Sequence, residues 1–130
     1  MNLLLDTHVF LWFISGDRRL PQAFLHKIQD TNNTVYLSVA SVWEAIIKYQ
    51  LNKLPLPQPP ESYLPLQRML HQIGSLPLDE ASVAQLASLP LLHRDPVDRI
   101  LISQAIDHNL TIVTLDGSIL DYSVAILSAS

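Results

Sequence analysis

Four acidic residues have the positions in this sequence that best suit chemistry. They are Asp6, Glu44, Asp98 and Asp116. Asp6 and Asp116 directly follow apolar runs, while Glu44 and Asp98 each lie early in an expected helix. Residues that leave the carboxyl ends of parallel strands meet at one edge of the sheet, where such folds build their sites. Carboxylates gathered there repel one another unless a cation holds them, and hard oxygen ligands favour Mg²⁺ or Mn²⁺.

Two of these acids also have a structural interpretation in their local sequence. Asp6 precedes a helical segment and could act as its N-cap. Glu44 stands four residues before Lys48, so the two could form an ion pair on one helix face. The neighbours of Glu44 are nearly all apolar, which predicts a largely buried helix. A carboxylate on such a helix needs a partner, so the ligand and ion-pair interpretations both stay open.

The other two acids also stand in segments with good local explanations. Asp95 and Pro96 are typical of an N-cap followed by the first helical residue, and Asp98 then occupies the third helical position. One acid would suffice for the helix, so Asp95 is the better cap and Asp98 the better ligand. Asp116 is followed by Gly117, which is also a turn signal.

Alternating strands and helices are expected to position these acids. Expected strands are residues 3–5, 35–39, 74–78, 111–115 and 124–127, and expected helices are residues 8–14, 21–29, 41–51, 62–72, 80–89 and 96–108. This order implies right-handed crossovers and a parallel sheet with helices on both faces, an α/β fold. The proline-rich residues 54–60 are interpreted as an internal loop, which leaves one domain over residues 1–130.

The composition excludes several classes of protein. Hydrophobic residues make up 48% of the 130 residues, which disfavours disorder. Cysteine is absent, so disulfides, thiolate zinc sites and cysteine nucleophiles are excluded, which suits a reducing cytoplasm. No apolar run approaches the length of a membrane span, and no signal peptide is recognised. The net charge of −4 argues against a nucleic-acid binder, unless the acids are concentrated around bound cations.

Four segments, in order, resemble the motifs of a known family. Residues 3–12 (LLLDTHVFLW) resemble the opening of PIN-domain nucleases, and residues 38–48 (SVASVWEAIIK) resemble their second acidic motif. Residues 93–102 (HRDPVDRILI) resemble the third motif in the form typical of VapC-like toxins, and residues 114–116 (TLD) resemble the fourth. The fourth motif departs from many relatives at Leu115, where they have a small or polar residue. Its acid is unaffected.

This resemblance implies a fold and a set of site residues. The fold would be a PIN-like three-layer α/β/α sandwich with a central, mostly parallel five-stranded sheet. Asp6, Glu44, Asp98 and Asp116 would be the catalytic acids and would bind Mg²⁺ or Mn²⁺. Thr7 would support them through its hydroxyl.

The predicted function is a metal-dependent endoribonuclease that acts as the toxin of a toxin–antitoxin pair. RNA as the substrate comes from the resemblance, and Lys48, Arg94 and Arg99 are candidate phosphate contacts. The resemblance also implies a homodimer and an antitoxin whose tail covers the acidic cleft. Exposed apolar side chains for these contacts are expected at Trp12, Phe13, Leu54 and Leu56.

Two other functions stay open at this point. A phosphoacceptor receiver domain also gathers acids at strand ends, but it normally has a second acid after its first strand, where this chain has Thr7. A non-catalytic RNA-binding module would favour a stacking platform in basic surroundings. Aromatic residues make up 7% of the chain, and its charge is negative.

Overall fold

Four short strands form a parallel sheet in the computed structural model, which describes residues 1–92, 95–119 and 122–127. The strands are β1 (Asn2–Leu5), β2 (Thr34–Ser38), β3 (Gly74–Leu76) and β4 (Thr111–Val113). Their order is β3-β2-β1-β4, so β1 lies in the centre and pairs with both β2 and β4. The α/β class and the parallel sheet expected from the sequence are confirmed.

Strands β3 and β4 end at Leu76 and Val113, two residues earlier than expected. The strand expected at residues 124–127 differs most from the prediction. It is reduced to a single parallel bridge between Ile112 and Ile126. Two backbone hydrogen bonds hold it, from Ile112 N–H to the Ala125 carbonyl and from Leu127 N–H to the Ile112 carbonyl. The sheet therefore has four strands among the described residues, and this segment continues it only locally.

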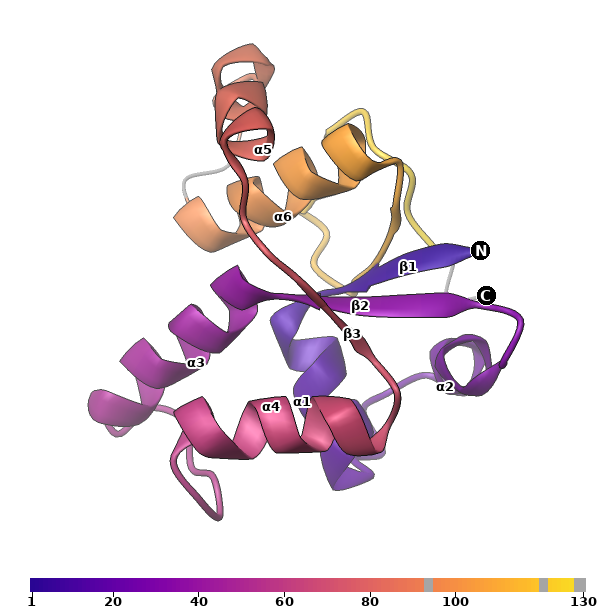
Figure 1. Ribbon diagram of the computed structural model, residues 1–130, viewed down its shortest axis with the longest axis vertical. Coiled ribbons are helices and arrows are strands. Elements are labelled where there is room, and N and C mark those ends of the chain that lie inside the picture. The colour runs from indigo at the N-terminus through magenta and orange to yellow at the C-terminus, as the bar shows by residue number, and fades with distance from the viewer. Residues whose placement is uncertain (93–94, 120–121, 128–130) are drawn as a thin grey trace.

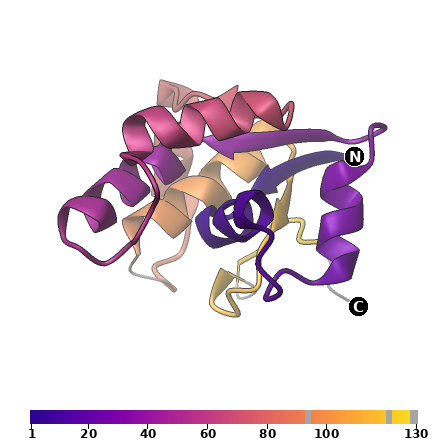
Figure 2. The ribbon, with the colours of Figure 1, turned by 90° about the horizontal axis from the view of Figure 1, so that it is seen from below.

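Helices cover both faces of the sheet (Figure 1). They are α1 (Thr7–Ser15), α2 (Gln22–Gln29), α3 (Val39–Gln50), α4 (Pro60–Leu70), α5 (Glu80–Gln85), the 3-10 turn η1 (Leu86–Ser88) and α6 (Pro96–His108). Helices α5 and α6 lie on one side, and α1, α2 and α4 lie on the other (Figure 1). Seen from below, α1 lies between the α3–α4 pair and α2 (Figure 2).

The three leucines of β1 divide the core into two layers. Leu3 and Leu5 pack into the cluster formed with α1, α2 and α4. Leu4 packs on the opposite side, against α6. This is the alternation that a strand imposes on successive side chains, and all three leucines are fully buried. The three-layer arrangement follows from it.

Local signals set the ends of the helices near the acids. Asp6 is the N-cap of α1, as its structural interpretation proposed, and Gly16 ends that helix in the left-handed region with φ 65°. Asp95 caps α6 and Pro96 is its first residue, as the sequence predicted. Asp79 caps α5.

Helix α3 is more exposed than its apolar sequence suggested. Trp43 is 50% exposed and Ile47 is 37% exposed, while Ala45 is buried. The expectation of a largely buried helix was therefore wrong, because only part of its surface meets neighbouring elements. Glu44 is partly buried on this helix.

The apolar side chains that were expected to be exposed for partner contacts are partly covered by the protein itself. Trp12, Phe13, Leu54 and Leu56 are partly buried and pack against the core. More exposed apolar side chains occur on α4, at Leu66, Met69 and Leu70. The proline-rich loop between α3 and α4 contributes Leu54 and Leu56 to the packing against the core. None of the helices in the described ranges is long and apolar enough to cross a membrane.

Candidate functional site

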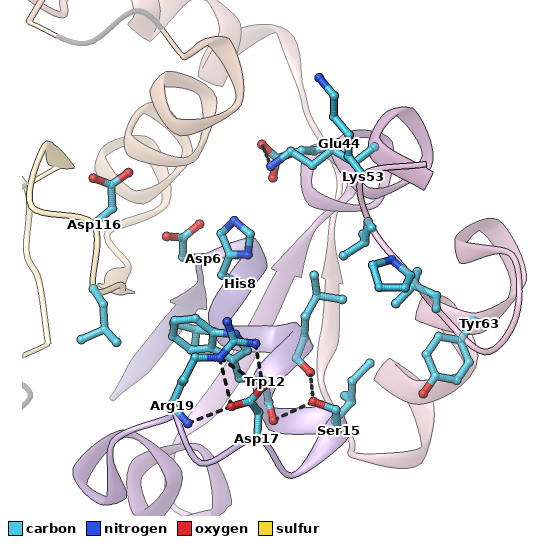
Figure 3. A pocket seen from close by; sticks show the side chains of 18 of the residues that line it. Asp6, His8, Trp12, Ser15, Asp17, Arg19, Glu44, Lys53, Tyr63 and Asp116 are labelled. Carbon is cyan, nitrogen blue, oxygen red and sulfur yellow. Dashed lines mark hydrogen bonds and ion pairs between the residues drawn. The ribbon is translucent and has the colours of Figure 1, made fainter. Parts of the chain in front are cut away.

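A cleft of about 780 Å³ brings the four predicted acids together. Asp6 leaves the end of β1, and Asp116 follows β4. Glu44 enters from α3 and Asp98 from the first turn of α6. Figure 3 shows Asp6 between Asp116 on one side and Glu44 on the other. Four segments that are far apart in the sequence therefore each place one of the predicted acids in a single cleft, which Asp17 and Asp95 also line.

Asp6 accepts a hydrogen bond at each of its two carboxylate oxygens. Its Oδ1 accepts a hydrogen bond of 2.7 Å from the Thr7 backbone N–H, and its Oδ2 accepts one of 2.7 Å from the Thr114 hydroxyl. The backbone N–H of Asp6 donates to the Val113 carbonyl, which fixes this residue against β4. The carboxylate is thus held in one orientation by groups that donate to both of its oxygens.

Burial raises the pKa of Asp6 above its ordinary value, because water is removed from the charged form. The hydrogen bonds from Thr114 and Thr7 oppose this rise, and His8 opposes it more weakly. The charge of Asp116 adds to the rise. The ionised form of Asp6 is therefore disfavoured when nothing positive is bound, even with two donors in place.

Glu44 lies beside a lysine, as one of its two interpretations proposed. The Lys48 Nζ atom is 3.7 Å from Glu44 Oε2, one helical turn away. The Glu44 side chain is 12% exposed and that of Lys48 is 37% exposed. Both residues line the cleft, so this ion pair is part of its wall. A lysine there lowers the local negative charge on the α3 side.

Asp95 and Asp98, the two acids at the start of α6, have different roles. Asp95 Oδ1 accepts hydrogen bonds from the backbone N–H groups of Val97 and Asp98, at 2.9 and 3.2 Å. The helix is capped by this residue, so it does not require the carboxylate of Asp98 as a cap. Asp98 lines the cleft and is 8% exposed. Asp95 is the cap, as predicted, and it also lines the cleft.

Thr114 is the residue that sequence reasoning missed at this site. Its hydroxyl donates to Asp6 and accepts from the Asp116 backbone N–H at 3.0 Å, so it connects two of the acids. Asp116 Oδ1 in turn accepts from Ser118. The spacing of Thr114 two residues before Asp116 was the available signal. Its partner Asp6 lies 108 positions away, which no local pattern reveals.

Thr7 supports the site in a different way from the one expected. Its backbone N–H donates to Asp6, whereas its hydroxyl donates to the Ser41 hydroxyl at 2.8 Å. Ser41 is fully buried in the first turns of α3. This contact ties the start of α1 to α3, and therefore sets how Asp6 and Glu44 face each other.

Of the candidate phosphate contacts that the structure describes, one lines the cleft and one does not. Lys48 lines the cleft, and so does Lys53, which the sequence did not single out. Arg99 instead points toward the 3-10 turn, where its Nη2 donates to the carbonyls of Leu86 and Leu89 at 3.5 Å. Arg94 lies outside the described residues.

A second group of acids lies away from this cleft. Asp79, Asp107 and His108 each offer a ligand atom within 4.8 Å of the others, and over the described ranges this is the tightest such group of three. The Asp79 side chain is exposed, those of Asp107 and His108 are partly exposed, and none lines the cleft. The four acids of the cleft are more widely spaced than this group.

Comparison with known proteins gives a family and a fold. The model of the PIN domain family matches residues 3–124. Ribonuclease VapC16 from Mycobacterium tuberculosis is 42% identical over 57 residues, which cover 44% of this chain and 40% of that protein. The match thus spans less than half of that relative.

Solved structures with the same fold come from toxin–antitoxin complexes. VapBC2 from Rickettsia felis, bound to a fragment of promoter DNA, superposes with a TM-score of 0.72 at 18% identity over 98% of both chains. DNA-bound VapBC from Salmonella typhimurium gives a TM-score of 0.70 at 13% identity over 100% of this chain and 99% of that one. At these identities the similarity establishes the fold.

Proposed function

Because this chain belongs to the PIN-domain family, we propose that it is a metal-dependent endoribonuclease. The observation that carries the proposal is the meeting of Asp6, Glu44, Asp98 and Asp116 in one cleft. These four carboxylates come from four separate segments, and the helix cap at α6 is already supplied by Asp95. We also propose that residues 1–130 act as one domain, since both core layers pack on one sheet.

The donor atoms of the cleft suit a hard divalent cation. All four acids offer carboxylate oxygens, and cysteine is absent from the chain. Burial disfavours the charged form of Asp6, which a bound cation would offset. Asp6, Glu44, Asp98 and Asp116 would hold Mg²⁺ or Mn²⁺. When bound, such an ion lowers the pKa of its water and neutralises charge on a phosphate.

The chain's own residues orient the acids and receive the substrate. Thr114 and the Thr7 backbone hold Asp6 so that the remaining lone pairs of its oxygens face the cleft. Lys48 and Lys53 also line the cleft and provide positive charge that suits the phosphates of the substrate. Arg94 is proposed as a further phosphate contact.

RNA as the substrate rests on the family and on the relative named a ribonuclease. The test is cleavage of a labelled single-stranded RNA with Mn²⁺, with Mg²⁺ and with EDTA. We expect internal cuts in both metals and none in EDTA. Cleavage that is indifferent to EDTA would contradict the proposal. Binding without cleavage in either metal would favour a non-catalytic RNA-binding module instead.

We further propose that the protein is a toxin neutralised by an antitoxin. The support is the relation to VapC16 and to the solved VapBC complexes. An antitoxin segment that placed an arginine among the carboxylates would satisfy their charge in place of the metal, and a guanidinium is suited to carboxylates. Growth arrest on expression, relieved by the protein of the neighbouring gene, tests this role. An antitoxin that leaves RNA cleavage unchanged would contradict the arginine mechanism.

A homodimer is the proposed assembly. Leu66, Met69 and Leu70 share one face of α4 and are each about half exposed or more, which is costly for an isolated protein. Their burial between two copies would remove that cost. The molar mass in solution at micromolar concentration shows whether the homodimer forms. Met69→Glu should shift the protein toward the monomer. A parent that is monomeric throughout would contradict the proposal.

A further inference from the structure

We propose that His8, Trp12 and Arg19 form a stacking path for the bases of single-stranded RNA, leading away from the carboxylates along α1. This inference rests on the proposed function, because it assigns a base-binding subsite to the same cleft. All three side chains line the cleft together with the acids. Figure 3 shows His8 beside Asp6, and Trp12 farther along with Arg19 over it.

The two aromatic side chains stand one helical turn apart on α1. Their ring centroids are 6.2 Å apart and the ring planes differ by 32°. His8 is exposed, whereas Trp12 is partly buried against the core and therefore has a fixed position. Successive rings held along the wall of a cleft offer surfaces on which unpaired bases can stack.

Arg19 extends this path as a flat group over the tryptophan. Its Cζ atom lies 5.1 Å from the centroid of the Trp12 ring. The guanidinium is held by Asp17 through contacts of 2.8 Å from Nη2 to Oδ2 and 3.1 Å from Nε to Oδ1. The Arg19 side chain is nevertheless 70% exposed. Its planar group is thus oriented before any ligand binds, and it remains accessible.

The ion pair with Asp17 indicates what Arg19 would recognise. The Arg19 hydrogen bonds lower the pKa of Asp17 to about 2, so at neutral pH the carboxylate and the guanidinium are both charged. An arginine whose charge is already matched is poorly suited to attract a phosphate. It still presents a guanidinium plane, and bases stack on such planes. The geometry therefore favours a base over a phosphate at this position.

The charge of the whole chain supports the same assignment. The net charge is −4, so attraction to the phosphate backbone is weak in this protein. Lys48 and Lys53 also line the cleft, and a backbone could run past them. The 3.7 Å contact of Lys48 with Glu44 is longer than the hydrogen bonds that hold Arg19, so it matches the lysine charge less closely. Stacking contributes roughly a factor of five to one hundred per base and needs no net positive charge. Affinity from stacking would compensate for the scarcity of cations.

Tryptophan fluorescence can test the path independently of cleavage. The chain has two tryptophans, so Trp43→Phe leaves Trp12 as the only one. The probes are a short single-stranded oligoribonucleotide and an abasic oligomer of equal length, titrated in EDTA at low salt. We expect the RNA to quench Trp12 and the abasic oligomer to have little effect. Equal quenching by both probes would overturn the proposal.

Matched variants separate stacking from charge. Arg19→Ala and Arg18→Ala remove the same charge, but Arg18 is absent from the cleft wall. We expect Arg19→Ala to weaken RNA binding several-fold more than Arg18→Ala, in fluorescence polarisation with the labelled oligomer. His8→Ala should weaken binding more than His71→Ala, which alters a histidine packed on Phe13. Equal effects within either pair would contradict the stacking path.

Variants of Trp12 complete the test. Trp12→Ala should weaken binding of the RNA about five- to one-hundred-fold, and Trp12→Phe should restore most of it. The rescue distinguishes a stacking role from a loss of folding, which circular dichroism also monitors. If these variants leave RNA binding intact and weaken only the binding of the antitoxin, the surface serves a protein partner and the inference fails.

Failure of this inference can be told apart from failure of the nuclease assignment. Base-dependent quenching without metal-dependent cleavage would support the stacking path and contradict the nuclease assignment. Cleavage that requires metal, together with quenching that ignores the bases, would retain the nuclease and remove the path.

Discussion

Helix α6 has a group of acids near each of its ends, and the two groups behave in opposite ways. Asp98 enters the cleft from the first turn of the helix, and the buried carboxylate of Asp6 lines the same cleft. Asp107 and His108 form the last turn and meet Asp79, the cap of α5. Both groups are rich in carboxylates, but only the first is enclosed by the fold.

The two carboxylates of the exposed group accept hydrogen bonds from within the protein. Asp79 accepts from the Ser82 backbone N–H at 2.9 Å, and this bond is the main reason that the pKa of Asp79 is lowered. Asp107 accepts from the Ser82 hydroxyl at 3.0 Å, and His108 lies 3.5 Å from Asp79. These acids join α5 to α6. Close spacing of acids therefore reflects a structural contact here.

The acids of the cleft differ from the exposed group in both their spacing and their electrostatics. Its acids are farther apart, yet burial raises the pKa of Asp6 despite two hydrogen bonds, and Asp116 raises it further. We therefore expect a site for a bound cation to be marked by a buried carboxylate whose charged form is disfavoured by burial, as at Asp6. The distance between carboxylates is a weaker guide.

The largest expected difference between the two regions is in RNA cleavage. Asp98→Asn removes a proposed ligand with little change in volume, and we expect a loss of at least about one-hundred-fold in the rate. Asp107→Asn makes the same change at the other end of α6 and should leave the rate close to that of the parent. A gel assay in Mn²⁺ compares them. Equal rates for the two variants would remove the distinction between the regions.

The second difference concerns metal binding and stability. In EDTA, Asp6→Asn should raise the melting temperature by a few degrees, because it removes a buried charge while asparagine can still cap α1. In Mn²⁺ the parent should gain up to about 3 kcal/mol at a hundred times the dissociation constant, and the variant should gain much less. Thermal melts measure both. A variant less stable than the parent in EDTA would show that the negative charge of Asp6 stabilises α1 as its N-cap.

Much of this arrangement could be predicted from local patterns. The sequence Asp95-Pro96 marked the start of α6, and the strand positions placed Asp6 and Asp116 at one edge of the sheet. Such signals depend on a few neighbouring residues and on the topology of parallel strands. They indicated which acids would share a cleft and which one would act as a cap.

The features that were missed depend on contacts between distant residues. Thr114 reaches Asp6 across 108 positions, and Arg19 lies over Trp12 because the loop after α1 turns back. The apolar sequence of α3 suggested burial, but the sheet and its helices cover only part of it, which leaves Trp43 exposed. The segment around Ile126 has the composition of a strand and forms one bridge. Periodicity does not reveal which surfaces have a neighbour.

A smaller difference is expected when a hydroxyl is removed from each region. Thr114→Val leaves a buried oxygen of Asp6 without its donor, which should cost about 1–3 kcal/mol of unfolding free energy at neutral pH in EDTA. Ser82→Ala removes the donor to Asp107, which is partly exposed, so water can replace it at a cost of about 1 kcal/mol or less. Chemical denaturation measures both. If Ser82→Ala lost more unfolding free energy than Thr114→Val, the buried carboxylate of Asp6 would not depend on its donor more than the partly exposed carboxylate of Asp107 does.

The smallest expected difference is in the pH dependence of stability, where the two regions should have opposite signs. The pKa of Asp6 is raised in the folded state above its ordinary value of 3.8. Its contribution to stability is therefore present below pH 3.8 and is lost as the pH rises through the raised value. The pKa of Asp79 is lowered from 3.8, so its contribution is present above pH 3.8 and is lost as the pH falls through the lowered value.

Two asparagine variants isolate these contributions, because asparagine keeps a capping oxygen at both positions. Relative to the parent in EDTA, Asp6→Asn should become more stable as the pH rises above 3.8. Asp79→Asn should become less stable over the interval in which the pH rises toward 3.8. The effect at Asp79 should be small, since solvent screens an exposed acid. Denaturation curves from roughly pH 3 to 7 give both differences. Differences of the same sign would mean that the carboxylate of Asp6 is as well matched by the fold as that of Asp79, and the case for a cation in the cleft would lose its electrostatic basis.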